Sequence, residues 1–307
     1  MNKTHMSLGE DSPEIITLFL SFDIVNSTYY KSLDKEQWSL TISKIIRYII
    51  SAFSNNPTGD YEFWKTLGDE VIYTRKIHSV QDLLDTLEEI YRTMILLNQK
   101  ISQGELFDGT ATQMLSIKAA TWLADLSSSH ERSNNILTYY QINDKRRQAD
   151  YIGPDIDTGF RSAHFTSSNR MVISFDIACI LMYSQKNLKA QGGLTSFVFS
   201  KYIHIMSYRV LKGVWNGIPY PILFYHGDSS ETFEASITER EKNTVIVIQE
   251  YLDSQEKQPK NILPEYNCYQ EQLLKQLCQK MELEFRIQHL IDLMNQMGLM
   301  SIQTVKI

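Results

Sequence analysis

The sequence has few of the features that mark secreted or nucleic-acid-binding proteins. Only three cysteines occur among 307 residues, and no two of them form a Cys-x-x-Cys pair. They predict reduced thiols in a cytoplasmic protein, without a disulfide framework or a zinc site. Basic side chains number 30 against 36 acidic ones. This deficit argues against a protein that binds nucleic acid through its phosphates.

Long hydrophobic runs and several common catalytic motifs are also missing. The longest apolar stretches, residues 15–22 and 171–183, are shorter than the roughly 20 residues that a transmembrane helix needs. Residues 1–12 are polar and contain no apolar core of a secretory signal. The sequence also lacks a Walker-type glycine loop, a Gly-x-Ser-x-Gly motif and a His-Glu-x-x-His motif. We therefore expect a soluble cytoplasmic protein that does not contact membranes.

The sequence does contain enough apolar residues for a large core, since 43% of them are hydrophobic and 21% are charged. The spacing of these residues predicts a strand, a helix, a hairpin, a second helix and a strand, at residues 15–23, 35–53, 61–67 with 71–75, 80–101 and 115–126. This order is a βαββαβ plan. It predicts a ferredoxin-like α+β fold, with an antiparallel sheet covered by two helices on one face.

The second half of the chain gives weaker signals. They indicate a helix near residues 154–165 and paired strands near residues 202–211 and 222–225. We expect a flexible N-terminus over residues 1–12, a main domain over residues 13–230 and a helical C-terminal extension over residues 231–307. The extension is expected to regulate the main domain or to promote oligomerisation.

Two acidic residues occupy positions that point to metal chemistry. Asp23 ends the apolar first strand, and Asp69 lies at the tip of the hairpin that should run beside it. Each residue alone is explained as well by a helix cap or by a turn. Together, two carboxylates meeting at neighbouring strand ends favour a bridging hard cation, and Mg²⁺ prefers one or two such groups with phosphate oxygens. The topology therefore predicts metal-assisted phosphoryl chemistry.

Three segments resemble the class III nucleotidyl cyclase family. Residues 22–28 read Phe-Asp-Ile-Val-Asn-Ser-Thr, residues 65–69 read Lys-Thr-Leu-Gly-Asp, and residues 150–161 run from Asp-Tyr-Ile-Gly to Gly-Phe-Arg. The family has Phe-x-Asp-Ile-x-x-Ser/Phe-Thr, Lys-x-x-Gly-Asp and Asp-x-x-Gly-x-x-x-Asn-x-x-x-Arg segments in this order. The resemblance covers residues 15–225 and implies a class III cyclase domain that acts as a head-to-tail homodimer with shared active sites.

The resemblance also implies roles for single residues. Asp23 and Asp69 match the acids that hold two Mg²⁺ or Mn²⁺ ions in each site, with the carbonyl of Ile24 as a further ligand. Lys65 and Asp150 match the pair that recognises the nucleobase.

The remaining matches concern the phosphates and the ribose. Arg161 matches the arginine that stabilises the pentavalent phosphate. Asp157 stands where the family usually has an asparagine that orients the ribose, and Lys212 resembles a late phosphate-contacting lysine. Arg161 and Lys65 are otherwise ordinary surface residues of a helix and a strand.

The identity of the base follows only in part from these residues. Lys65 donates and Asp150 accepts, which matches adenine and cytosine, while uracil needs the reversed use of both groups. Residues 158–160, Thr-Gly-Phe, differ from the small residues of common adenylyl cyclases and resemble the bacterial pyrimidine cyclases of Pycsar antiphage systems. Bulky side chains at Trp64, Tyr151 or Phe160 would narrow the base pocket.

This resemblance predicts conversion of CTP, or as second choice UTP, to the 3′,5′-cyclic monophosphate and pyrophosphate. It implies that a separate effector protein senses the product in defence against phage. Two alternatives stay open, namely an adenylate cyclase and an inactive cyclase-like domain that binds a nucleotide. The combined presence of Asp23, Asp69 and Arg161 argues against the inactive domain.

Overall fold

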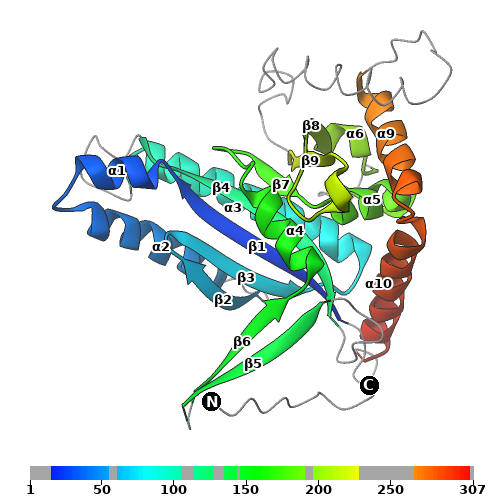
Figure 1. Cartoon of the computed structure of the whole chain (residues 1–307), viewed down its shortest axis with the longest axis horizontal. Coiled ribbons are helices and arrows are strands. Elements are labelled where there is room, and N and C mark those ends of the chain that lie inside the picture. The colour runs from blue at the N-terminus through cyan, green and yellow to red at the C-terminus, as the bar shows by residue number, and fades with distance from the viewer. Residues whose placement is uncertain are drawn as a thin grey trace.

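The computed structural model describes residues 15–54, 61–105, 114–126, 135–143, 146–190, 196–227 and 266–304. Its centre is a seven-stranded sheet with the order β2-β3-β1-β4-β7-β9-β8 (Figure 1). The strands are β1 (Ile15–Val25), β2 (Tyr61–Leu67), β3 (Glu70–Lys76), β4 (Ser116–Leu126), β7 (Met171–Ile173), β8 (Ile203–Arg209) and β9 (Tyr220–Tyr225). Neighbouring strands are antiparallel except β4 and β7, which are parallel. The prediction of an α+β fold with a mainly antiparallel sheet is confirmed.

The first four strands have the order of a ferredoxin-like sheet, with β1 in the middle between β3 and β4. β1 is buried almost throughout because both of its faces are covered, and its apolar run of Ile16, Leu18, Phe19, Leu20 and Phe22 is at most 1% exposed. The hairpin of β2 and β3 forms as the sequence predicts. The register pairs Phe22 of β1 with Val71 of β3. The turn of the hairpin therefore lies at the end of the sheet where β1 finishes.

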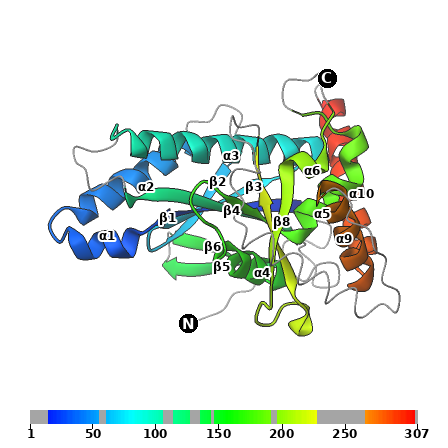
Figure 2. The same ribbon diagram turned by 90° about the horizontal axis from the view of Figure 1, so that it is seen from above.

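Two long helices, α2 (Trp38–Ser54) and α3 (Val80–Ser102), cover one face of this sheet (Figure 2). Their apolar stripes face the strands, as shown by the ring of Phe53, which lies 5.2 Å from that of Phe22. Ser79 caps α3 by accepting a hydrogen bond from the Asp82 backbone N–H. A short helix, α1 (Ser27–Leu33), follows Asn26. The Asn26 side chain makes no capping hydrogen bond; its backbone is left-handed, with φ 62° and ψ 12°, and its amide donates to the Met114 carbonyl.

The opposite face carries a separate hairpin, β5 (Ile136–Asn143) with β6 (Arg146–Ile152), and the helix α4 (Pro154–Ala163) (Figure 2). α4 lies very close to β4, since a Cβ atom added at Gly159 would come within 2.2 Å of the Trp122 ring. Only glycine permits this approach. α4 confirms the predicted helix near residues 154–165, whereas the hairpin was not predicted.

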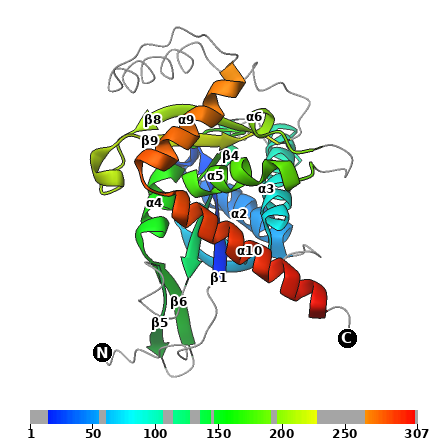
Figure 3. The ribbon, with the colours of Figure 1, turned by 90° about the vertical axis from the view of Figure 1, so that its right-hand side faces the viewer.

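The remaining helices are α5 (Phe175–Ser184), α6 (Phe199–Tyr202), α9 (Tyr266–Lys280) and α10 (Glu284–Thr304), with short 3₁₀ turns at Gln185–Asn187 and Trp215–Gly217. Figure 3 shows α9 and α10 lying along α5. Their buried side chains, among them Leu274, Leu277, Ile287 and Met294, belong to the same core as the sheet. The C-terminal segment is helical as predicted. The division of the chain at residues 12 and 230 stays a prediction, and residues 1–14 and 228–265 lie outside the described part.

Within the described residues, none of the helices combines the length and the apolar character needed to cross a membrane.

Candidate active site

The two predicted metal acids lie at the same end of the sheet. Asp23 is near the end of β1, and Asp69 is in the turn that joins β2 to β3. The antiparallel pairing of β1 with β3 brings that turn to the end where Asp23 lies. Each acid has its own lysine: Lys118 Nζ is 3.0 Å from Asp23 Oδ2, and Lys31 Nζ is 3.1 Å from Asp69 Oδ1.

Glu70, the first residue of β3, is a further member of this site to which the sequence assigned no role. It accepts a hydrogen bond from the Ser21 hydroxyl on β1. Burial raises the pKa of the Glu70 carboxyl above its ordinary value, the Ser21 hydrogen bond lowers it, and the charge of Asp23 raises it further. A signal was present in the sequence, because Glu70 directly follows Asp69. We call Asp23, Asp69 and Glu70, with Lys31 and Lys118, the carboxylate end.

The donors of the carboxylate end suit a hard divalent cation, because carboxylate oxygens are the ligands that Mg²⁺ and Mn²⁺ prefer. No group of three or more metal-ligating side chains gathers anywhere in the described part of the chain. Two carboxylates fit Mg²⁺ when phosphate oxygens and water complete its shell. Lys31 and Lys118 pair with these acids, and both lysine side chains are partly exposed, at 30% and 21%. Ile24, the further predicted ligand, follows Asp23 on β1 with its side chain buried.

The predicted base-recognising pair is brought into direct contact. Lys65 on β2 and Asp150 on β6 are 85 residues apart in the chain, yet Lys65 Nζ lies 2.9 Å from Asp150 Oδ1. The same carboxylate oxygen accepts the backbone N–H of Tyr151 at 3.1 Å. Both side chains of the pair are partly exposed, at 25% and 31%. A ligand can therefore reach the pair.

Aromatic rings pack beside this pair. Trp64 and Tyr151 meet edge to face at 4.9 Å, and Phe160 lies 6.1 Å from Trp64. Phe19 and Trp122 complete this aromatic cluster from β1 and β4. Lys65 Nζ is only 3.9 Å from the centre of the Trp64 ring, a cation–π contact. All three side chains expected to narrow the base pocket thus lie in one cluster next to Lys65.

The helix α4 carries the other two predicted catalytic residues. Its first turn lies beside Asp125 near the end of β4, and Gly159 lies against Trp122. α4 therefore runs back along β4 toward the carboxylate end, where the charge of His164 acts on Glu70. Arg161, in the last turn, is partly buried, and Asp157 is exposed. Among the described residues, neither side chain has a hydrogen-bond or ion-pair partner.

Lys212 lies apart from the carboxylate end. It is an exposed residue in the connection between β8 and β9. The strand registers place the start of β8 and the end of β9 level with Phe22, close to the carboxylate end. The end of β8 and the start of β9, which the Lys212 segment connects, therefore lie toward the opposite end of the sheet. Within one chain, Lys212 and Asp23 do not share a site.

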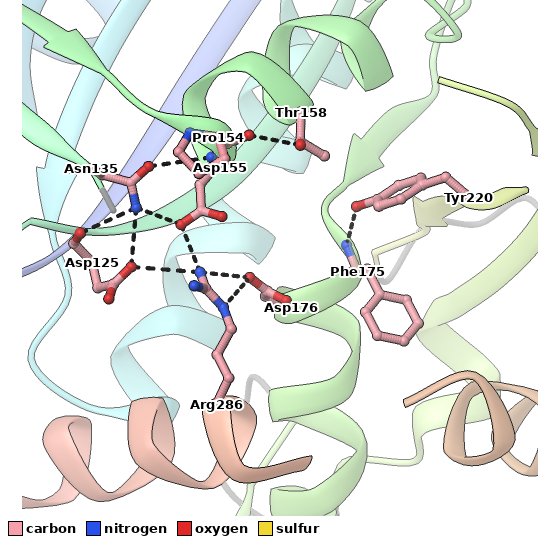
Figure 4. A network of polar contacts seen from close by, with 9 residues as sticks. All are labelled: Asp125, Asn135, Pro154, Asp155, Thr158, Phe175, Asp176, Tyr220 and Arg286. Atoms are coloured by element: carbon pink, nitrogen blue, oxygen red, sulfur yellow. Dashed lines mark hydrogen bonds and ion pairs between the residues drawn. The ribbon is translucent and has the colours of Figure 1, made fainter. Parts of the chain in front are cut away.

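Arg286 on α10 forms a second charged centre that the sequence did not indicate (Figure 4). Its guanidinium lies 2.6 Å from Asp155 Oδ2 on α4, 3.1 Å from Asp176 Oδ2 on α5 and 3.5 Å from Asp125 Oδ1 on β4. Asn135 donates to both Asp125 and Asp155. We call these five residues the Arg286 cluster. Its four charged members come from β4, α4, α5 and α10, so no local spacing could reveal it.

A scan of protein-family descriptions finds no match, and a search of curated proteins finds none either. Solved structures with a similar chain course include an adenylyl cyclase from P. aeruginosa, at 12% identity and TM-score 0.48, over 72% of this chain and 98% of that chain. A guanylyl cyclase matches at 11% identity and TM-score 0.48, over 72% and 96%. The guanylate cyclase domain of a Catenaria anguillulae protein, solved with GTP, matches at 14% identity and TM-score 0.44, over 70% and 98%. The chain is similar to these proteins at low identity, and its function has to be inferred from its own side chains.

Proposed function

We propose that this chain is a nucleotidyl cyclase that converts a pyrimidine nucleoside triphosphate to its 3′,5′-cyclic monophosphate and pyrophosphate. One observation carries the proposal: the ion pair of Lys65 with Asp150, 2.9 Å long, joins two residues from distant segments that the motifs single out as the base-recognising pair. Asp23 and Asp69 at a common end of the sheet support it. If the Lys65–Asp150 ion pair served only stability, it would not require two further acids at a common end of the sheet.

The reaction joins the ribose 3′ oxygen to the α-phosphorus. The bond from the α-phosphorus to the bridging oxygen breaks, pyrophosphate leaves with the electron pair, and the 3′ proton passes to water. Mg²⁺ or Mn²⁺ held by Asp23, Asp69 and the Ile24 carbonyl would lower the pKa of the 3′ hydroxyl and neutralise the triphosphate. Arg161 spreads positive charge over the phosphoryl oxygens, a role that suits a planar guanidinium. Asp157 accepts from a ribose hydroxyl, and Lys212 of the same subunit as Arg161 contacts the phosphates.

The aromatic cluster supports a pyrimidine. Trp64, Tyr151 and Phe160 lie next to Lys65, where their bulk would leave less room for the second ring of a purine. The Lys65 ammonium donates to the ring nitrogen of cytosine, and Asp150 accepts from its amino group, so CTP is the first choice. UTP is the second choice, because it needs Lys65 on a carbonyl and Asp150 on the ring N–H. Adenine offers the same edge as cytosine, so ATP has to be tested beside them.

The proposed site is shared between two copies of the chain. One copy supplies Asp23 and Asp69, and the other supplies Lys65, Asp150 and Arg161. Exposed apolar side chains near the second set support a contact between copies: Tyr139, Tyr140 and Ile152 of the β5–β6 hairpin and Phe63 of β2 are each about half exposed. The product would act on a separate effector protein in defence against phage.

A mixing experiment tests the shared site. Asp69→Ala and Arg161→Ala are each expected to be inactive as pure proteins. In mixed dimers, one of the two sites receives both changes and the other receives none. Activity is then expected to return to about a quarter of wild type after random exchange of subunits. If mixing restores no activity while exchange of labelled subunits is complete, the shared site is wrong.

The substrate is tested by incubating the purified chain with each of the four labelled nucleoside triphosphates and Mg²⁺ or Mn²⁺. We expect cyclic CMP as the main product, cyclic UMP next, and none from Asp69→Ala with its fold intact by circular dichroism. Cyclic AMP as the main product would replace the pyrimidine proposal by an adenylate cyclase. Nucleotide binding without any product would favour the inactive domain, in which Lys31 and Lys118 stay on the two acids.

A further inference from the structure

We propose that Arg286 is a positioning residue for the cyclase reaction: through Asp155 it fixes the helix α4, which carries Arg161, so that α10 is part of the catalytic unit. This inference rests on the proposed function. It also assigns a role to the C-terminal helices, whose expected function was left open between regulation and oligomerisation.

The contact between Arg286 and α4 is short and charged. Arg286 Nη2 donates to Asp155 Oδ2 at 2.6 Å, in the first turn of α4. The same guanidinium donates to Asp176 Oδ2 on α5, through Nε at 3.3 Å and Nη2 at 3.1 Å. One planar group thereby connects α10 with α4 and α5 (Figure 4). Such charge-assisted bonds are stronger than neutral ones and fix direction as well as distance.

The start of α4 depends on this network because it lacks a cap of its own. Gly153 stands at the N-cap position and offers no side chain, and the second residue before it, Tyr151, is held by Asp150. Instead, Asn135 Oδ1 accepts a hydrogen bond from the Asp155 backbone N–H at 3.2 Å. Asn135 Nδ2 also donates a hydrogen bond to the Asp155 carboxylate at 2.6 Å. Free N–H groups at a helix start need such partners. Residues distant in sequence therefore supply what a local cap supplies elsewhere.

α4 is held at a second point by its contact with β4. Gly159 lies so close to Trp122 that any side chain there would clash with the ring. A rigid helix held at two points cannot slide or tilt. If Arg286 is removed, the first turn of α4 loses its charged contact and keeps the neutral one from Asn135, so this turn is held less firmly and can tilt about Trp122. Arg161 is two residues from that pivot and about 9 Å along the axis from Asp155, so a tilt of the first turn also reorients its guanidinium.

Arg286 itself is held firmly by its own helix. The next residue, Ile287, is 1% exposed, and Leu290 and Met294 on the same side of α10 are at most 1% exposed. α10 packs against α5 and reaches the start of β1. The three carboxylates around Arg286 repel one another when it is absent, since burial and mutual repulsion already raise the pKa of Asp125 to about 6. Because Arg286 lies on a helix packed into the core, its guanidinium holds the first turn of α4 in a fixed position.

The test compares the kinetics of four full-length variants with wild type, each assayed well below its own unfolding temperature. Arg286→Met is expected to lower kcat by about 10- to 100-fold. KM for the triphosphate is expected to change by less than about twofold, because the Lys65–Asp150 pair and the carboxylate end are unchanged. Arg286→Lys keeps the charge without the fork and is expected to recover part of kcat. Asp155→Asn weakens the same contact more gently and covers the case in which Arg286→Met does not fold. Gln288→Ala, on the exposed side of α10, is the matched control and is expected to match wild type.

A double-mutant cycle separates positioning from general stability. If Arg286 acts through Arg161, then Arg286→Met in the Arg161→Ala background has no further effect on kcat. A full additional loss of kcat in that background, or an unchanged kcat in Arg286→Met and Asp155→Asn, would overturn the inference.

Hydrogen exchange keeps this inference distinct from the proposed function. Backbone amides of residues 154–163 are expected to exchange faster in Arg286→Met and in Asp155→Asn than in Gln288→Ala. If the wild-type chain makes no cyclic nucleotide, the proposed function is wrong, and faster exchange in these residues still supports the hold of Arg286 on α4. Unchanged exchange contradicts that hold whatever the activity is.

Discussion

The carboxylate end and the Arg286 cluster both gather acidic side chains, but they neutralise them in different ways. At the carboxylate end, Asp23 and Asp69 each hold one lysine, and Lys31 is 30% exposed. In the Arg286 cluster, three carboxylates share a single guanidinium. The first arrangement consists of separate pairs, while the second is one connected network across four segments.

This difference suits the carboxylate end to the proposed exchange of its lysines for a metal ion, and the Arg286 cluster to a fixed position. A lysine ammonium is a point charge on a flexible stem, so it can leave when a metal ion and phosphates arrive. The Arg286 guanidinium is planar and fixed by three partners, and the nearby Asp176 and Asp155 raise its pKa against the opposing effect of burial. The proposed binding end and the Arg286 cluster thus lie at opposite ends of the sheet, and α4 runs between them.

The largest difference is expected in stability. Arg286→Met leaves the partly buried carboxylates of Asp125, Asp155 and Asp176 without the cation that they share, and is expected to lower the free energy of unfolding by about 3–5 kcal/mol. Asp69→Ala removes a partly exposed pair and is expected to cost about 0–1 kcal/mol. Urea unfolding followed by circular dichroism measures both. Equal losses of unfolding free energy would mean that the Arg286 cluster contributes no more to stability than the carboxylate end.

The next largest effect is expected on kcat, from a change at Arg161 in the last turn of α4. Arg161→Ala removes the charge proposed to stabilise the transition state, and is expected to lower kcat by about 10²- to 10³-fold. The unfolding temperature should stay within about 1 °C of wild type, since Arg161 holds no partner among the described residues. Steady-state kinetics and calorimetry on the same preparation give both numbers. A large drop in unfolding temperature would make Arg161 a structural residue.

A smaller effect is expected from pH at the Arg286 cluster. Burial is the main cause that raises the pKa of Asp125 to about 6, and Arg286 opposes it. Because the folded protein holds this proton more tightly than the unfolded chain, the contribution to stability is present below about pH 4 and is lost as the pH rises through 6. Asp125→Asn should remove this loss, which amounts to at most about 3 kcal/mol.

The measurement for Asp125 is the difference in unfolding free energy between wild type and Asp125→Asn at several pH values from 4 to 7. The difference between the two proteins isolates the contribution of Asp125, because all other acidic residues are present in both. A difference that does not change with pH would show that Asp125 titrates alike in the folded and unfolded chains.

The smallest effect is expected from the lysine beside Asp23. Lys118→Met removes a competing cation from the acid, so Mn²⁺ is expected to bind a few-fold more tightly, while the free energy of unfolding changes by less than about 1 kcal/mol. Titration followed by electron paramagnetic resonance measures the Mn²⁺ affinity. Unchanged Mn²⁺ affinity would mean that Lys118 does not compete for this site.

Much of the fold was predictable from the sequence because its signals are local. The apolar run of β1, the helical spacing of α2 and α3 and the Gly68-Asp69 turn each fix one element without reference to the rest. The β5–β6 hairpin was missed, because its alternating pattern is weak and half of it is polar.

The candidate site divides in the same way. The contact of Lys65 with Asp150 was expected from motifs, whereas the contact of Glu70 with Ser21 and the lysines on Asp23 and Asp69 depend on strand register. A register shift by one residue would turn these side chains to the other face. Such contacts cannot be inferred from spacing along one segment.

The sequence by itself determined the order of the strands and helices of the first half, the acids at two strand ends and the chemistry that those residue types allow. Only the tertiary structure decided which lysines neutralise these acids, that aromatic rings crowd Lys65, and that Arg286 holds the helix of Arg161. The physical reason is that periodicity and turn residues act over a few positions, while ion pairs and ring contacts depend on segments that meet only when the core packs.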